Sequence, residues 1–164
     1  MKPKFLVVAA LAAAALAGAC TPAPGPGSTP TYTEGICPTS SGVTVVVDFA
    51  PLFDQIIVRC ALGPQASGFD ALEAIGININ ANAPDAVPGS VCTLNGLPIE
   101  GYPYCWTEGG YWSSWLAAST AGTWDYAPGG PGDPIAEGTA YGWAWAPGFV
   151  SDGPRVGPDG DPLP

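Results

Sequence analysis

The chain has 164 residues, of which 23 are glycine and 20 are proline. Because these residues interrupt helices and central strands, the composition excludes a helical bundle and a coiled coil. The chain has 14 acidic side chains but only four basic ones, and beyond Lys4 the only basic residues are Arg59 and Arg155. Such an acidic surface repels phosphate groups, so we expect neither nucleic-acid binding nor adhesion to anionic lipid headgroups.

The missing residue types exclude much catalytic chemistry. The chain has no histidine, and both lysines lie within its first four residues. Ser-His-Asp and Cys-His relays and Schiff bases need these residues, and zinc or copper sites usually need imidazole or clustered thiolates. We therefore expect no enzymatic activity, no metal and no cofactor. A hydrolase that uses two carboxylates is the one catalytic alternative that we retain.

Residues 1–19 are typical of a secretory signal peptide. They contain a charged start and an apolar run at residues 5–16, which is too short to span a bilayer. Residues 16–20, Leu-Ala-Gly-Ala-Cys, also resemble a bacterial lipobox, which predicts lipidation of Cys20. The expected location is the outer, extracytoplasmic face of the cell membrane, with the lipid anchor as the only membrane contact. The alternative is ordinary cleavage and secretion, with an unlipidated Cys20.

The cysteine count favours the lipid anchor. The chain has five cysteines, and an odd cysteine in an exported protein needs a partner or a use. Lipidation of Cys20 leaves four cysteines for two disulfides. Three pairings are open, and we predict Cys37 with Cys60 and Cys92 with Cys105 because each bridge joins neighbouring predicted elements.

The chain divides into a tether, one domain and a tail. Residues 20–36 are proline-rich and lack apolar periodicity, which predicts an extended lipoprotein tether or linker. Residues 37–146 are the predicted folded domain, and their length supports one domain. Residues 147–164 show no pattern and are predicted to be a disordered tail.

The first half of the domain predicts a hairpin followed by a helix. Residues 43–49 and 55–62 are rich in β-branched side chains that alternate between two faces, as in an antiparallel hairpin. Residues 67–76 predict one short helix, with Ser67 as its N-cap and Gly76 as its left-handed stop.

The second half predicts short strands. Asn95-Gly96 between residues 91–94 and 97–99 is a strong signal for a two-residue type I′ hairpin turn, and Pro98 suits an edge strand. Three further strands are predicted, at residues 111–115, 122–126 and 141–145. The predicted fold class is therefore α+β: a small mixed or antiparallel sheet with one short helix, stapled by disulfides.

Two charged features are assigned no functional role. Arg59 is expected to pair with Asp48 across the first hairpin, as a modest surface contact. The sequence Asp159-Gly160-Asp161 lacks the further ligands of a calcium loop, so it is assigned to the tail.

A set of short motifs extends over residues 37–145. It comprises residues 42–49, Ala71-Leu72, Cys92 with Gly96 and Pro98, Tyr111-Trp112 with Trp115, Trp124, and Gly142-Trp143. Together these motifs resemble the transcobalamin-like C-terminal domain family of secreted actinobacterial proteins. The resemblance implies a soluble-ligand-binding β-grasp fold, related to the domain that closes over the corrin ring in vitamin B12 carriers. Bacterial relatives look like accessories of energy-coupling vitamin or cobalt transport systems.

The tryptophans are the main candidates for ligand contact. The chain has six of them, at residues 106, 112, 115, 124, 143 and 145. Indole faces stack on flat ligands, but tryptophan also fills the cores of small domains. Alternation places Tyr111 and Trp115 on one face of their strand and Trp112 on the other. The candidate ligand-binding residues are Tyr111, Trp112, Trp115, Trp124, Trp143 and Trp145.

Two functional hypotheses follow. The first is a membrane-anchored extracytoplasmic module that binds a small soluble ligand, such as a corrinoid, through aromatic stacking and acts beside a membrane transporter. The second is a cell-surface module whose exposed aromatic side chains contact a glycan or a protein, without a small-molecule ligand. A concave aromatic pocket favours the first hypothesis, and a flat exposed aromatic row favours the second.

Overall fold

The computed structural model describes residues 31–83, 86–99, 109–127 and 130–163. The predicted signal peptide, Cys20, most of the predicted tether, Cys105 and Trp106 lie outside these ranges. Within the described ranges, no helix has the length and apolar character needed to cross a bilayer.

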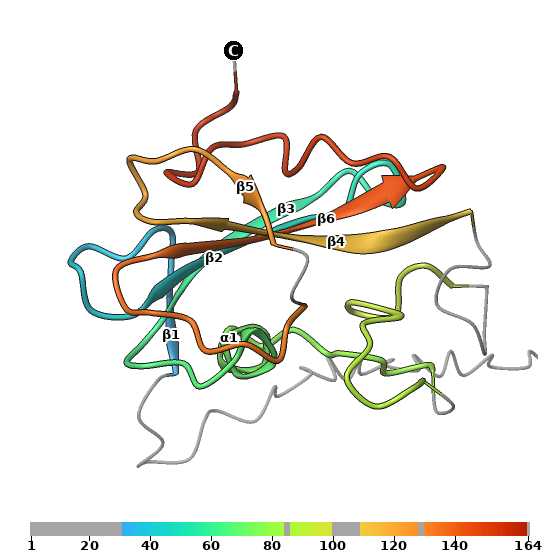
Figure 1. Cartoon of the computed structure of the whole chain (residues 1–164), viewed down its shortest axis with the longest axis horizontal. Coiled ribbons are helices and arrows are strands. Elements are labelled where there is room, and N and C mark those ends of the chain that lie inside the picture. The colour runs from blue at the N-terminus through green and yellow to red at the C-terminus, as the bar shows by residue number, and fades with distance from the viewer. Residues whose placement is uncertain (1–30, 84–85, 100–108, 128–129, 164) are drawn as a thin grey trace, which may run out of the picture.

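The described residues form one mixed sheet of six strands. The strands are β1 (Tyr32–Glu34), β2 (Val43–Asp48), β3 (Ile56–Ala61), β4 (Gly110–Ala117), β5 (Asp125–Tyr126) and β6 (Ala140–Pro147). Their order in the sheet is β1-β3-β2-β6-β4-β5. β2 and β6 pair in parallel, and the other neighbouring strands pair antiparallel. In Figure 1 the sheet is seen edge-on, with the helix α1 (Gly68–Ala74) on one side and residues 148–163 on the other.

The helix α1 has the ends that the sequence predicts. Ser67 Oγ accepts a hydrogen bond from the backbone N–H of Asp70 at 3.1 Å, and Gly76 adopts a φ of 80°, which favours glycine. A Cβ atom at Gly68 would lie 2.5 Å from the Tyr141 side chain on β6. The glycine therefore allows the helix to approach the sheet closely.

The core fills the space between the sheet and α1. Many of its side chains come from α1 and its C-cap, from the 94–97 turn, from one face of β2, β4 and β6, and from the residue after β2: Val43, Val45, Val47, Phe49, Leu72, Ile75, Leu94, Trp112, Tyr141, Trp143 and Trp145. Aromatic rings meet edge to face, with centroids 5.5 Å apart for Phe49 and Trp112 and 5.8 Å apart for Trp112 and Trp145. Edge-to-face contact is favourable because it brings the positive edge of one ring against the negative face of the other.

The hairpin of β2 and β3 is confirmed, but its predicted ion pair is wrong. Arg59 lies opposite Val45, so its side chain extends on the helix face of the sheet. There it donates to Glu34 Oε1 at 3.0 Å and to the Ile75 carbonyl at 2.8 Å. Asp48 lies three positions after Val45 and therefore faces the other side. The two side chains cannot meet across the hairpin.

The predicted Cys37–Cys60 disulfide is confirmed, with the two Cα atoms 4.7 Å apart. It joins β3 to the chain that precedes β2. Cys92 is also disulfide-bonded, and Cys105, which we expect as its partner, lies outside the described residues.

The Asn95-Gly96 turn is confirmed as a two-residue hairpin turn. Both residues have positive φ, at 50° and 79°, and Leu94 and Leu97 exchange two backbone hydrogen bonds of 3.0 Å. The flanking residues form isolated bridges, between Leu94 and Leu97 and between Leu94 and Ile79, rather than strands. Leu94 is fully buried, so this turn anchors its loop in the core.

Two predicted boundaries are wrong. β1 lies within the stretch predicted as tether, because residues 32–34 pair with the edge of β3. The tail predicted to be disordered from residue 147 begins inside β6, and residues 148–163, called the C-terminal segment below, cover the sheet face opposite α1 (Figure 1). Pro154 and Val156 are buried there. A segment anchored by a few tertiary contacts has no periodic pattern of its own, so the sequence alone did not reveal it.

Candidate functional site

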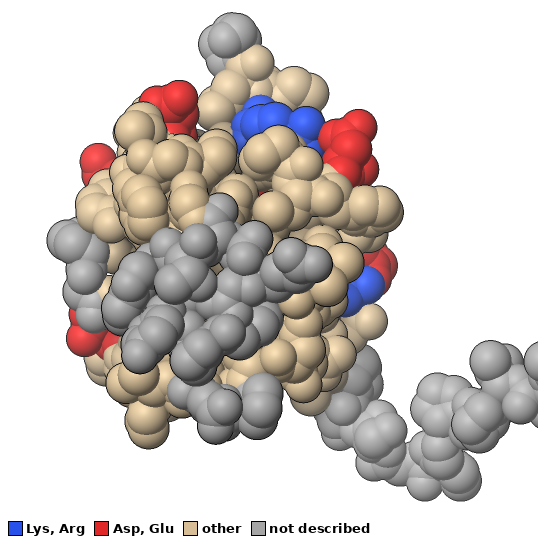
Figure 2. Space-filling view, turned by 90° about the vertical axis from the view of Figure 1, so that its right-hand side faces the viewer, with Lys and Arg blue, Asp and Glu red and all other residues tan. Residues whose placement is uncertain are grey.

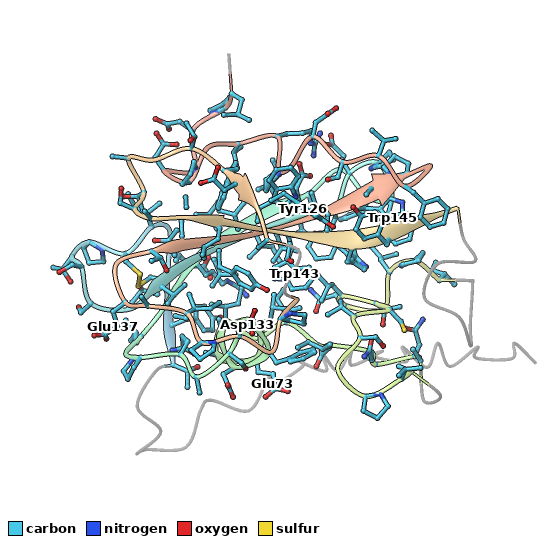
Figure 3. All side chains as sticks on the ribbon, viewed as in Figure 1. Glu73, Tyr126, Asp133, Glu137, Trp143 and Trp145 are labelled. Carbon is cyan, nitrogen blue, oxygen red and sulfur yellow. A yellow bond between two sulfur atoms is a disulfide. The ribbon has the colours of Figure 1, made fainter. Side chains whose placement is uncertain are left out.

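The structure divides the described tryptophans between two environments. Trp112, Trp143 and Trp145 are buried in the core, with exposed fractions of 5%, 1% and 6%. Trp115 and Trp124 are half-buried, and both lie on the face that the C-terminal segment covers. Figure 3 shows Tyr126, which contacts Trp115, and Trp143 on opposite sides of the sheet. The alternation in β4 therefore separates a face that packs in the core from a face that the C-terminal segment covers in part.

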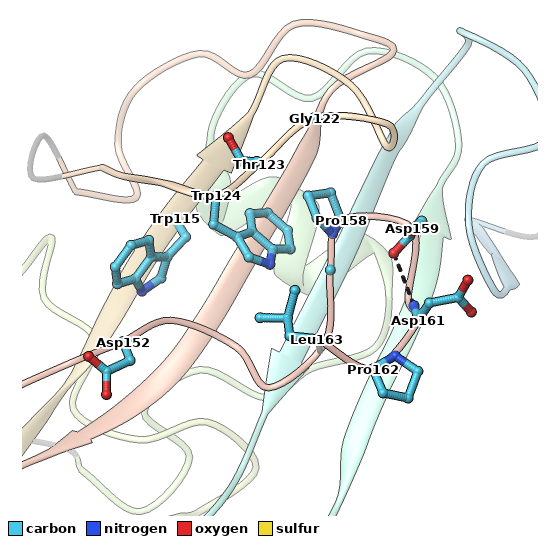
Figure 4. Close-up of a pocket in the computed structure, with 11 residues that line it drawn as sticks. Trp115, Gly122, Thr123, Trp124, Asp152, Pro158, Asp159, Asp161, Pro162 and Leu163 are labelled. Atoms are coloured by element: carbon cyan, nitrogen blue, oxygen red, sulfur yellow. Dashed lines mark hydrogen bonds between the residues drawn. The ribbon is translucent and has the colours of Figure 1, made fainter.

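Trp115 and Trp124 line one pocket of about 390 Å³, called the indole pocket below. Trp115 comes from β4, and Trp124 comes from the connection between β4 and β5. The C-terminal segment supplies the opposite wall, through Asp152, Gly157, Pro158, Asp159, Asp161, Pro162 and Leu163. Figure 4 shows both indole rings extending toward this segment. The pocket thus joins two candidate residues from the sequence to a segment that the sequence analysis assigned no role.

Both indoles are held in place by their own N–H groups. Trp124 Nε1 donates to the Val156 carbonyl at 2.8 Å. Trp115 Nε1 donates to Ser113 Oγ at 2.9 Å, and this hydroxyl donates in turn to the Ala144 carbonyl of β6 at 2.8 Å. The rings are therefore oriented before any ligand arrives, and what they offer to the pocket is their apolar faces and edges.

The glycines beside the indoles are sites of close packing. A Cβ atom at Gly142 on β6 would lie 3.1 Å from the Trp124 ring and 3.0 Å from Pro154. Gly153 in the C-terminal segment has a φ of 89°, and its Cβ position lies 3.4 Å from the Trp115 ring. Small residues at these two places let the segment and the rings pack against the sheet.

Among the described residues, the charged side chains that line the indole pocket are all acidic. They are Asp152, Asp159 and Asp161, and all three are exposed. Asp159 Oδ1 accepts a hydrogen bond from the Asp161 backbone N–H at 3.1 Å, which shapes the turn at Gly160. The pocket therefore combines aromatic faces with carboxylate acceptors.

The two arginines of the domain are occupied elsewhere. Arg155 binds Asp48 and Asp54, and Arg59 binds Glu34, each at 3.0 Å. The hydrogen bonds to Asp48 and Asp54 raise the pKa of the Arg155 guanidinium. In Figure 2 each of the two blue patches lies beside a red one.

A row of aromatic side chains leads away from the indole pocket along the outer face of β4. The Phe149 ring stacks on Tyr111 with centroids 6.3 Å apart, the Tyr111 and Tyr126 hydroxyls lie 3.3 Å apart, and Tyr126 meets Trp115 edge to face at 5.4 Å. Phe149 and Tyr126 are 53% and 49% exposed. We call Tyr111, Trp115, Tyr126 and Phe149 the aromatic row.

Two other pockets contain candidate residues. Tyr111, Trp112 and Trp143 line a hollow of about 220 Å³ at the β4 edge, and Trp145 lines one of about 350 Å³ beside Arg155. The structure thus does not bring all six candidates together. Trp112, Trp143 and Trp145 expose too little of their rings for a ligand to stack on them.

The role of the C-terminal segment in the site was not predicted from the sequence. One residue in the sequence, Asp48, indicates that a distant cation must pack against β2. A carboxylate within a β-branched, buried strand needs a cation, and the chain beyond Lys4 has only Arg59 and Arg155 to supply one. Since Arg59 occupies the wrong face, the remaining partner comes from the C-terminal segment.

Within the described residues, no three histidine, cysteine, aspartate or glutamate side chains gather as a metal site would require. No protein-family model, curated protein or solved structure matches the chain.

Proposed function

We propose that this protein is an extracytoplasmic binding module that captures a small soluble ligand in the indole pocket. The observation that carries the proposal is the pair of half-buried indoles, Trp115 and Trp124, fixed by internal hydrogen bonds around one pocket of about 390 Å³. Small-molecule sites commonly have volumes of about 300–1,000 Å³ and aromatic walls with a few polar groups. The indole pocket has this size and composition.

We also propose that the domain has a β-grasp fold. In support, the hairpin of β2 and β3 is followed by α1, and the last strand β6 lies parallel to β2 at the centre of the sheet. A helix packed across one face of such a mixed sheet is the arrangement of β-grasp domains. The resemblance over residues 37–145 agrees with this assignment. A shared fold does not determine the ligand, so the resemblance supports the fold and leaves the ligand to experiment.

The resemblance suggests a corrinoid as one ligand to test. The volume of the indole pocket is near the lower end of the range for drug-sized ligands, and a corrin ring is larger than such ligands. The pocket would therefore enclose one edge of the ring, and a second protein, such as a membrane transporter, would cover the rest. Lipidation of Cys20 would place the module on the outer face of the membrane, beside that partner.

Saturation-transfer NMR on the full chain tests the proposal. The panel contains cyanocobalamin, neutral sugars, organic cations, carboxylates and phosphate. We expect at least one neutral or cationic compound to bind, and its signal to be lost with Trp115→Ala or Trp124→Ala. Phe149→Ala is the matched control, because it removes an exposed aromatic ring outside the indole pocket. Absence of binding across the panel, or binding that survives both tryptophan substitutions, would contradict the proposal.

The aromatic row supports a second candidate function, that of a cell-surface module that contacts a glycan. Exposed aromatic rings in a line suit stacking against successive sugar rings. Sedimentation with insoluble cell-wall glycan distinguishes the two functions. Loss of co-sedimentation with Phe149→Ala but not with Trp124→Ala would favour the aromatic row over the indole pocket.

A further inference from the structure

We propose that the indole pocket selects organic cations, such as quaternary ammonium compounds. This inference rests on the proposed function, because it names the ligand class of the same pocket. It follows from the groups that are available to a ligand, which are the indole faces and the carboxylates, and from the indole N–H donors, which are not available.

The indole N–H groups are not available to a ligand, because both already donate hydrogen bonds within the protein. Trp115 Nε1 is bonded to Ser113 Oγ and Trp124 Nε1 to the Val156 carbonyl. The rings can therefore offer their π faces but not their N–H donors. The face of an aromatic ring carries a negative potential, and indole attracts cations more strongly than the other aromatic side chains do.

Within the residues that the structure describes, the carboxylates of the pocket form no ion pair with an arginine or lysine. Among the ion pairs of the described residues, Arg59 is paired with Glu34, and Arg155 with Asp48 and Asp54. None of these contacts involves Asp152, Asp159 or Asp161, and no arginine or lysine lines the pocket in the described part of the chain. A ligand cation would supply the missing positive charge.

An anion would meet the opposite situation. It would approach three carboxylates and two ring faces, and no arginine or lysine among the described lining residues would balance its charge. A neutral molecule of the same shape would gain the contact area of the rings but not the electrostatic attraction. The pocket therefore ranks a cation above its neutral isostere and the isostere above an anion.

The test compares choline with 3,3-dimethylbutan-1-ol, in which carbon replaces the charged nitrogen. The full chain is titrated with each, and binding is followed on the indole N–H signals of Trp115 and Trp124. We expect choline to bind about tenfold more tightly, since two half-buried indoles each contribute a cation–π attraction. Equal or tighter binding of the neutral alcohol would overturn the inference.

Charge substitutions give a second measurement. Asp152→Asn with Asp161→Asn should weaken choline binding roughly threefold and leave the neutral alcohol unchanged, because partly exposed charges contribute modestly. Glu137→Gln is the matched control, since Glu137 is an exposed carboxylate on the helix side of the sheet (Figure 3). An equal effect of Glu137→Gln would show a response to net charge alone and would overturn the inference.

The outcomes separate this inference from the proposed function. If a sugar or cyanocobalamin binds through Trp115 and Trp124 while choline does not, the inference is wrong and the proposed function stands. If no compound of the panel binds through these residues, both are wrong.

Discussion

Arg155 holds Asp48 in a bidentate contact, although the two residues are 107 positions apart in sequence. Arg155 Nε lies 3.0 Å from Asp48 Oδ2, and Nη2 lies 3.0 Å from Oδ1. The Asp48 side chain is only 3% exposed, whereas that of Arg155 is 49% exposed. The contact fastens the C-terminal segment to β2, and this segment forms one wall of the indole pocket.

Arg155→Met should lower the free energy of unfolding by about 2 kcal/mol, because it leaves the buried carboxylate of Asp48 without its counter-ion. The backbone N–H groups of Ala50 and Arg155 still donate to this carboxylate, which limits the loss. Urea unfolding measures the change. Amide hydrogen exchange across residues 153–163 should accelerate as the segment detaches.

Asp54→Asn is the control for this prediction, because it removes the other partner of the same arginine. The Asp54 side chain is 92% exposed, so we expect a change within about 0.5 kcal/mol. A similar loss for both variants would mean that the buried position of Asp48 does not matter.

Replacement of both Cys37 and Cys60 by serine should lower the free energy of unfolding by about 3 kcal/mol, because the unfolded chain gains the freedom of the opened loop. The two cysteines lie 23 positions apart in the sequence. Urea unfolding of the double variant beside the oxidised parent chain measures the difference. A loss below about 1 kcal/mol would contradict this account of the disulfide.

Tyr141→Phe should make the domain less sensitive to alkaline pH. The Tyr141 hydroxyl is buried without a hydrogen bond that satisfies normal geometry, and burial raises its pKa above the ordinary value of 10.0, although nearby Ser114 opposes this shift. Folding therefore favours the neutral phenol. Its contribution is complete below pH 10 and is lost as the pH rises further. Urea midpoints of both proteins at pH 8 and pH 11 measure the effect.

Tyr111→Phe is the control for the alkaline effect. The hydrogen bond with Tyr126 raises the pKa of Tyr111 to about 12, so its contribution has the same sign. Tyr111 is more exposed than Tyr141, and solvent screens its interactions. We expect a smaller change in alkaline sensitivity than for Tyr141→Phe, and the reverse order would contradict the assignment to burial.

Cys20→Ser should release the protein from the membrane fraction into the medium, because a single thiol carries the predicted lipid anchor. Fractionation of cells that express the parent chain and the variant measures the distribution. Retention of the variant in the membrane fraction would mean that another contact holds the protein there.

The elements with strong local signals could be predicted from the sequence. The hairpin of β2 and β3 follows from its β-branched alternation, α1 from Ser67 and Gly76, and the 95–96 turn from an Asn-Gly pair that accepts positive φ. Each signal depends on neighbouring residues, so no knowledge of tertiary contacts is needed.

The site could be predicted only in part. Alternation in β4 separates Trp115 from Trp112, but it does not say which face is covered by α1. The partner of Asp48 and the C-terminal wall of the pocket depend on contacts between distant parts of the chain. Such contacts hold the C-terminal segment on the sheet through Arg155, Pro154 and Val156. The local sequence around these residues resembles that of a disordered tail.

The most direct test of the central claim is a set of intermolecular nuclear Overhauser effects between bound choline and the full chain. The account predicts contacts from the choline methyl protons to the indole protons of both Trp115 and Trp124 and to the Leu163 methyl groups. Those residues come from the two walls of the indole pocket. Contacts confined to Phe149 and Tyr111, or no contacts at millimolar choline, would contradict capture of a cation by the indole pocket.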